Sequence, residues 1–189
     1  MVEVRPATVF EDVAAVIGPK RPDASVCFCL SHRIPARENQ ALAGPARGEY
    51  VRALTQRDPA PGVLAYDGPT PVGWSGIAPR SATQFARSTR IPRLDDLPVW
   101  SLWCLRVRAG HRGTGITPAL IEGAVAFAAE HGAPMVEAYP VDSGGQRVDR
   151  TMAFVGLREW FERAGFVVAA ETTSTLDGFP RVLMRRDLR

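Results

Sequence analysis

One stretch of the chain, Leu105 to Leu120 (LRVRAGHRGTGITPAL), limits the possible folds more than any other. An apolar strand leads into an Arg-Gly-Thr-Gly turn and then directly into a helix, with Pro118 in the first turn, where its missing N–H costs nothing. Glycines let backbone N–H groups approach a ligand closely, and the start of a helix adds unpaired N–H donors and a partial positive charge. Because Arg106, Arg108 and Arg112 lie beside it, we predict that this turn binds phosphate.

Two other kinds of phosphate-binding loop fit this stretch poorly. A P-loop needs the pattern GxxxxGK[ST], and no lysine lies near the turn. A dinucleotide-binding fingerprint needs GxGxxG, but Gly113-Thr114-Gly115 is followed by Ile-Thr-Pro, so the third glycine is absent. A tight strand-to-helix turn that binds no ligand is the structural alternative.

The whole chain predicts a single α/β domain covering residues 1–189. Its length corresponds to about one domain, 46% apolar residues are enough for an ordinary core, and no repeat or linker marks a boundary. In the N-terminal half, the patterns of apolar residues predict a strand at 2–8, a helix to residue 17 opened by a Thr8–Glu11 capping box, a helix at 37–55 interrupted at Gly44-Pro45, and hairpin strands at 62–67 and 71–78. In the C-terminal half, they predict a strand at 98–108, a helix at 114–131, a strand at 134–141, a helix at 150–164 and a closing strand pair. This order indicates an α+β architecture, in which a mixed, mostly antiparallel sheet is flanked by helices.

Charge and composition argue against several classes of function. A net charge of +3 is too small to indicate nucleic-acid binding. No apolar stretch approaches the ~18 residues of a transmembrane helix, and the N-terminus has no signal-peptide pattern, so we expect a cytoplasmic protein without a membrane partner. The three cysteines and three histidines lack metal-ligand spacing, so we expect no metal; we expect buried thiols, with a redox or substrate-pocket role left open. From Gly68 to Ile121 the only acids are Asp95 and Asp96 among seven arginines, which favours an anionic ligand.

The phosphate-binding stretch resembles the pyrophosphate motif [Q/R]-x-x-G-x-[G/A] of the GNAT (Gcn5-related) N-acetyltransferases. Arg112, Gly115 and Thr117 fall on the three motif positions, and Val107 lies where the family ends its fourth strand. Downstream, REWFERAGF (158–166) is similar to the late helix of the family, which ends in Gly-Phe. The predicted order of elements also fits the GNAT fold over nearly the whole chain.

The resemblance implies a cofactor, a reaction and a set of binding residues. The cofactor is acetyl-CoA or another acyl-CoA, and the acyl group passes directly to an amine of a small molecule or a protein. The backbone of residues 104–107 pairs with the pantetheine arm, and the amides of residues 112–117 hold the pyrophosphate. The implied cofactor-binding residues are Leu105, Arg106, Val107, Arg112, Gly113, Thr114, Gly115, Ile116 and Thr117. Monomer and homodimer are both compatible with the resemblance.

The chain departs from the family pattern in three places. Thr117 stands where glycine or alanine is usual, so its side chain either crowds the turn or bonds a phosphate oxygen. Phe161 stands where many members have a tyrosine that protonates the leaving thiolate. The stretch 99–103 has no carboxylate, whereas some members carry a glutamate base there. A non-catalytic acyl-CoA-binding or regulatory module on the same fold is therefore an alternative.

Glu137 and Tyr139 are the candidate catalytic residues. They are two apart on a predicted strand and so share one face, which in the GNAT fold adjoins the acyl group. Glu137 could take the proton of the amine, and Tyr139 could supply the proton that Phe161 cannot. The alternative is that both are edge residues with solvated ends. Cys104 could act as a nucleophile only beside a base, and none is evident.

The acceptor site is expected in the N-terminal half of the chain. The candidates are residues 27–33 (CFCLSHR), Trp74 and the Arg-rich connection 79–98. Phe28, Trp74, Trp100 and Trp103 could form an aromatic-walled pocket, or could be plain core.

Overall fold

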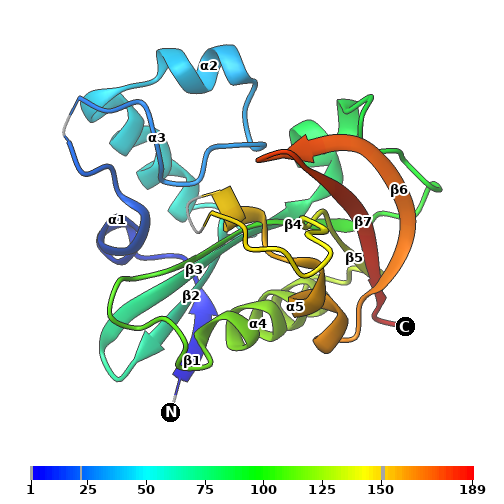
Figure 1. Ribbon diagram of the computed structural model, residues 1–189. Helices are drawn as coiled ribbons and strands as arrows, with labels where there is room; N and C mark the ends of the chain where they lie inside the picture. The colour runs from blue at the N-terminus through cyan, green and yellow to red at the C-terminus, as the bar shows by residue number, and fades with distance from the viewer. Residues whose placement is uncertain (1, 22, 150–151) are drawn as a thin grey trace.

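A seven-stranded sheet forms the centre of the computed structural model, which describes residues 2–21, 23–149 and 152–189. The strand order is β1-β2-β3-β4-β5-β7-β6, and every neighbouring pair is antiparallel except β4 and β5 (Figure 1). The strands are β1 (Val2–Pro6), β2 (Gly62–Asp67), β3 (Thr70–Pro79), β4 (Trp100–Val107), β5 (Met135–Ala138), β6 (Val167–Leu176) and β7 (Phe179–Asp187). The mixed, mostly antiparallel sheet is therefore confirmed.

Helices cover both faces of the sheet (Figure 1). One face carries α1 (Phe10–Ile17), α2 (Ala36–Ala41) and α3 (Gly44–Thr55), and the other carries α4 (Ile116–Glu130) and α5 (Arg158–Arg163). Short 3-10 helices form η1 (Arg80–Ala82), η2 (Gln84–Arg87) and η3 (Met152–Val155). No helix among the described residues has both the length and the apolar character needed to cross a membrane.

The sheet divides the interior into two apolar cores. Along β2, Val63 and Ala65 face α4, whereas Leu64 and Tyr66 face the α1 side, as strand alternation requires. The helix predicted at 114–131 is α4, and its five periodic apolar residues (Ile116, Leu120, Ala124, Phe127 and Ala128) are all buried. Gly123 lets α4 lie close to β1, because a Cβ there would lie 2.3 Å from a Val4 methyl carbon.

The parallel pair β4–β5 separates soon after it begins. Pairing is limited to three registers, the last of which joins Leu102 to Ala138. A bulge in β4 follows at once, because Gly76 pairs with Cys104 and Ile77 with Leu102, which leaves Trp103 as the extra residue. We call this divergence of β4 and β5 the split. From Trp103 onward, β5 no longer pairs with β4, so this backbone edge is available for another partner.

Two local predictions are wrong. The capping box is absent: α1 begins at Phe10 with Val9 as N-cap, and no side chain caps it. The helix predicted at 150–164 is broken, with residues 150 and 151 outside the described residues. The remainder forms η3 and α5, separated by Gly156 at φ +85°. That backbone conformation favours glycine and cannot continue a right-handed helix.

Candidate functional site

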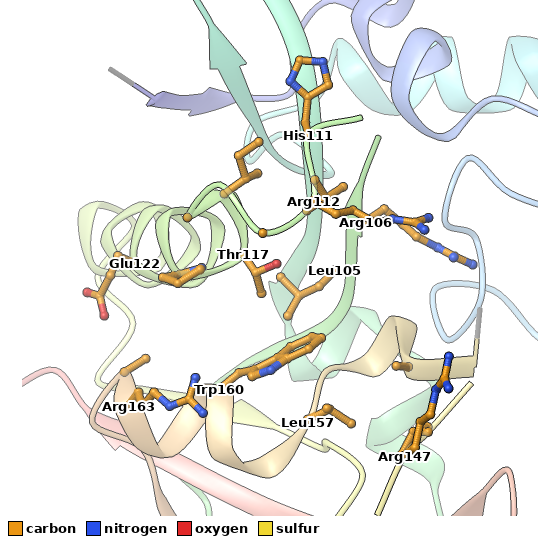
Figure 2. Close-up of a pocket in the computed structure, with 18 of the residues that line it drawn as sticks. Leu105, Arg106, His111, Arg112, Thr117, Glu122, Arg147, Leu157, Trp160 and Arg163 are labelled. Atoms are coloured by element: carbon orange, nitrogen blue, oxygen red, sulfur yellow. The ribbon is translucent and has the colours of Figure 1, made fainter. Parts of the chain in front are cut away.

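A cavity of about 920 Å³ lies where the second half of β4 meets the start of α4 and one side of α5 (Figure 2). We call it the main cavity. Trp160 extends from α5 into this space, toward Leu105 on β4 (Figure 2). The segment 146–148 and residues near η3 close the remaining side. The cavity therefore opens beside the β4 edge that β5 leaves unpaired.

The predicted phosphate-binding turn forms one wall of the main cavity. Gly113 and Gly115 have φ +77° and +84°, and Gly115 is the N-cap of α4. No side chain caps the helix and no acidic residue lies in its first turn. The helical bonds begin with Ala119, whose N–H donates to Gly115 O at 3.3 Å, so the N–H groups of Ile116 and Thr117 precede the first intrahelical donor. The helix start is thus open to an anion.

Basic side chains surround the turn. Those that line the main cavity are Arg106, His111, Arg112, Arg147 and Arg163. Among the described lining residues, Glu122 is the one acidic residue, and its carboxylate already pairs with Arg186 at 2.7 Å. Arg147 and Arg163 were not predicted, because they lie far from the turn in sequence and only the fold brings them to it.

Eight of the nine predicted cofactor-binding residues line the main cavity, and Thr114 does not. The Thr114 hydroxyl instead donates to His111 O at 2.7 Å, within the turn itself. Arg108 is also directed elsewhere, since its guanidinium donates to Pro71 O at 3.2 Å. Thr117, by contrast, faces the cavity (Figure 2).

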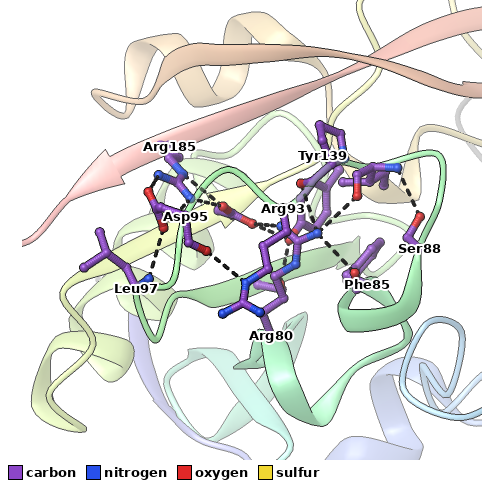
Figure 3. A network of polar contacts seen from close by, with 12 residues as sticks. Arg80, Phe85, Ser88, Arg93, Asp95, Leu97, Tyr139 and Arg185 are labelled. Atoms are coloured by element: carbon purple, nitrogen blue, oxygen red, sulfur yellow. Dashed lines mark hydrogen bonds and ion pairs between the residues drawn. The ribbon is translucent and has the colours of Figure 1, made fainter.

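Glu137 and Tyr139 meet as predicted, but away from the main cavity. Both are fully buried, so the alternative of solvated edge residues is wrong. The Tyr139 hydroxyl donates to Glu137 Oε2 at 2.8 Å and lies 2.7 Å from Ser101 Oγ. Arg80 donates to the same carboxylate oxygen at 2.6 Å, and Arg185 donates to the other at 2.7 Å (Figure 3). Glu137 is therefore the acceptor for two guanidinium groups.

This network fastens the connection between β3 and β4, residues 80–99. Arg80 Nη2 donates to the carbonyl oxygens of Phe85, Ile91 and Pro92, each at 3.1 Å. Arg185 also pairs with Asp95 of the same connection (Figure 3). These contacts give Glu137 a structural role. Catalysis by Glu137 and Tyr139 stays a prediction.

The buried hydroxyl of Tyr139 holds its proton tightly. Burial raises the pKa of Tyr139, and the negative charge of Glu137 raises it further. The group can still donate a hydrogen bond, but it gives up a proton only with difficulty. Phe161, at the position where the family has a tyrosine, is fully buried against Phe166 and has no proton to give.

The four aromatic residues considered for an acceptor pocket are buried in the apolar cores, which is the alternative to a pocket wall. Phe28, Trp74 and Trp103 share the core on the α1 side. Trp100 does not join them, because it faces the other side of the sheet and packs edge-on against Phe127, with ring centroids 5.8 Å apart. A stack that the sequence did not indicate lies near the split, where Phe85 contacts both His32 (ring centroids 4.7 Å apart) and Tyr139 (4.2 Å).

Cys27 and Cys29 lie in a segment with strained backbone beside the α1-side core. The expectation of buried thiols is confirmed for Cys29 and Cys104, whereas Cys27 is only partly buried. Cys27, Phe28 and Cys29 all have positive φ, between +46° and +68°, and Arg47 holds the segment through two bonds to Cys27 O. Burial raises the pKa of the Cys29 thiol, but hydrogen bonding with Cys104 and neighbouring groups outweighs it and lowers that pKa.

Cys104 has the opposite shift. Burial is the main cause that raises the pKa of its thiol well above the ordinary value, and the adjacent Cys29 adds to it. Cys104 therefore stays protonated at neutral pH, which argues against a nucleophilic role.

The fold and the site together are those of an α+β protein with a cationic cleft beside a split in its sheet. Residues 31–166 match the Acetyltransferase (GNAT) family, and the chain belongs to that family. No curated protein sequence matches the chain.

Solved structures share the fold at low sequence identity. A protein from Desulfovibrio desulfuricans described as a GNAT acetyltransferase is 17% identical, with full coverage of both chains and a TM-score of 0.57. Ard1 from Thermoplasma volcanium is 13% identical, with 100% of this chain and 98% of that chain covered and a TM-score of 0.55. A chain of the NatC complex bound to Gag peptide and CoA is 13% identical, with 100% and 99% coverage and a TM-score of 0.55.

Proposed function

We propose that this protein transfers an acetyl group from acetyl-CoA to the amine of a small molecule or a protein. The carrying observation is the main cavity, in which an open helix start and four arginines lie beside the unpaired edge of β4. The solved NatC structure of the same fold contains CoA, which supports the choice of cofactor.

The residues of the main cavity fit the parts of an acyl-CoA. The amides of residues 113–117 and the guanidinium of Arg112 match a pyrophosphate, since they provide donors and positive charge without a competing acid. The β4 backbone from Leu105 to Val107 offers hydrogen bonds to the amides of the pantetheine arm. When bound, acetyl-CoA supplies the activated thioester. Arg147 and Arg163 add charge for the remaining phosphate.

A non-catalytic acyl-CoA-binding module is the second candidate function. It is favoured by Phe161 at the tyrosine position and by the two arginines that occupy the Glu137 carboxylate. The two functions share cofactor binding and differ in turnover, so they are separated by experiment.

Calorimetric titration of acetyl-CoA, CoA and NADH tests the cofactor. We expect one-to-one micromolar binding of both CoA species and none of NADH. Gly115→Glu should weaken CoA binding at least ~100-fold, because a carboxylate would occupy the open helix start. Gly178→Glu is the matched control, since Gly178 has a similar φ of +79° and open surroundings in the β6–β7 turn. Equal CoA affinity in the two variants would refute the assignment of the turn.

Release of free CoA thiol across a broad panel of amines tests the reaction. Acceptor-dependent release establishes the transferase. Slow hydrolysis of acetyl-CoA that no amine accelerates, together with intact CoA binding, establishes the binding module instead.

A further inference from the structure

Arg181 is a buried cation without a carboxylate partner among the described residues. Its side chain belongs to β7, and the residue is only 4% exposed. Nε donates to Tyr139 O at 2.8 Å and Nη1 reaches Ser174 Oγ at 3.5 Å, but Nη2 has no partner in the described chain. A buried guanidinium is costly unless its charge and its donors are matched.

The other buried arginines among the described residues, Arg47 and Arg80, have both terminal amino groups paired, although Arg80 Nε has no partner. Arg80 pairs with Glu137, and all three nitrogens of Arg47 donate to backbone carbonyl or amide oxygens. Arg181 differs from both because one amino group of its guanidinium is left over. That amino group is buried and has no acceptor among the described residues.

Arg181 lies at the split. It forms an isolated bridge with Val141, and Val182 N–H donates to Pro140 O at 3.1 Å, so β7 here follows the chain that continues β5. The bond from its Nε to Tyr139 O places the guanidinium beside the first residue after the last β4–β5 pair. The main cavity reaches the split from the α4 and α5 side, whereas Tyr139 belongs to the core on the α1 side.

The connection 80–99 and the loop before α2 lie close to Tyr139 and β6. The Phe85 ring packs at a tilt against the Tyr139 ring, and Arg90 O accepts from Thr173 N–H at 3.1 Å, which ties the connection to β6. His32 stacks on Phe85 and is partly exposed. Tyr139, whose carbonyl accepts from Arg181, is therefore part of an aromatic group built from residues that the proposed cofactor site does not use.

The electrostatic environment of the Arg181 guanidinium is positive. Burial lowers the pKa of His32 to about 4, and the charge of Arg181 contributes to the shift, so the imidazole is neutral at physiological pH. Glu137, which accepts from the Tyr139 hydroxyl, is already paired with Arg80 and Arg185. A polycationic amine would meet an uncompensated like charge here, whereas an anionic group would complete the pairing.

We propose that Arg181 binds the carboxylate of the acceptor, so that the amines acetylated by this protein are amino acids or other amines that carry a nearby carboxylate. The inference rests on the proposed acetyltransferase function and names its substrate class. The side chain of Arg181 would hold the carboxylate, while the amine lies at the split, toward the thioester. Arg181 is then a specificity-determining residue, not one that takes part in proton transfer.

Paired acceptors test the proposal directly. We would compare L-amino acids with their C-terminal amides, which keep the amine and remove the carboxylate charge, and include spermidine as a polycation. The expected kcat/KM is roughly 100-fold higher for the acid than for its amide, because the amide leaves Arg181 unpaired. Arg181→Met should abolish this preference without changing acetyl-CoA affinity, and Arg181→Lys should keep part of it. Equal use of acids and amides, a preference for spermidine, or an unchanged preference in Arg181→Met would overturn the proposal.

A second readout does not need turnover. The His32 ring can be titrated by NMR with and without the N-acetyl-amino acid product. A bound carboxylate should raise the pKa of His32 from about 4, because it offsets the charge of Arg181. In Arg181→Lys, which retains the charge and is the safer variant for folding, the response should weaken.

The two readouts separate the failure of the proposed function from the failure of this inference. A His32 response to the carboxylate without acetyl-CoA binding would leave the anion site standing and the transferase refuted. Acetyl-CoA turnover without any His32 response to a carboxylate would refute the anion site alone.

Discussion

At the scale of the residue, Glu137 shows how strongly a buried carboxylate depends on its partners. It is fully buried, and both oxygens accept from guanidinium groups, at 2.6 Å from Arg80 and 2.7 Å from Arg185. Glu137→Gln would leave the buried Arg80 without its counter-charge and Arg185 with Asp95 alone. We expect a loss of about 3–5 kcal/mol in the free energy of unfolding, measured by urea denaturation.

Glu122→Gln is the matched control for Glu137→Gln. Glu122 also pairs with an arginine, Arg186 at 2.7 Å, but its side chain is 52% exposed, so we expect a loss below about 1 kcal/mol. If Glu137→Gln were as stable as the wild type and yet lost turnover, the structural role would be wrong and the predicted catalytic role would gain support.

The site residues that the sequence could reveal are those whose role depends on local order along the chain. The turn around Arg112 and Gly115 was predictable because strand, glycines and helix start are contiguous, and the fold only has to preserve their local order. Arg147, Arg163 and Arg181 were not predictable. Each is an ordinary polar residue in sequence and acquires its surroundings only from tertiary contacts.

At the scale of the element, Gly156 separates η3 from α5 and shapes the wall of the main cavity. Its φ is +85°, and an added Cβ would lie 2.5 Å from a Phe161 ring carbon and 3.2 Å from Leu105 Cδ1. Gly156→Ala therefore adds a steric clash in a buried core to the cost of a left-handed backbone. We expect a loss of about 3 kcal/mol or more in the free energy of unfolding, together with weaker CoA binding.

Gly145→Ala isolates the backbone cost. Gly145 has φ +82° and nothing within 4 Å of an added Cβ, so only the conformational penalty of about 1–2 kcal/mol applies. Equal losses in the two variants, measured by urea unfolding, would show that the contact with Phe161 relaxes freely and would contradict the steric argument.

Gly156 also marks the limit of what periodicity predicts. The hairpin β2–β3, strand β4 and helix α4 were predicted because their apolar patterns are long and their burial follows the pattern. The helix predicted at 150–164 failed because a helical apolar spacing continues through Gly156, while packing against Phe161 decides the backbone there. The capping box at Thr8 failed because α1 begins one residue beyond Val9, which has no polar side chain.

At the scale of the whole molecule, the sheet separates two faces with different roles. The α4 side presents the main cavity with its arginines, and the α1 side holds the Glu137 network and the stack of His32, Phe85 and Tyr139. Because β4 and β5 part between these faces, the proposed function would bring acetyl-CoA from one side and the acceptor amine from the other together at the split. The two apolar cores therefore pack on a sheet in which β4 and β5 pair over only three registers.

The pH dependence of global stability reports on the α1 side. Burial lowers the pKa of His32 from 6.5 to about 4 in the folded protein, with a further contribution from Arg181. As pH falls from about 6.5 to about 4, the unfolded chain binds a proton at His32 that the folded chain does not bind, so the stability due to this group is lost over that window. Its slope approaches about 1.4 kcal/mol per pH unit at most.

His32→Gln should remove this component. We expect the free energy of unfolding of the wild type to fall more steeply than that of the variant between pH 6.5 and 4, and the two curves to run parallel above pH 7. Below about pH 4, carboxylates held ionised by arginines, such as Asp95 and Asp142, lose their pairing in both proteins, because their pKa values are also lowered. Urea unfolding at each pH measures the difference. Parallel curves throughout the window would show that His32 titrates freely in the folded protein, and the positive surroundings inferred for Arg181 would then be wrong.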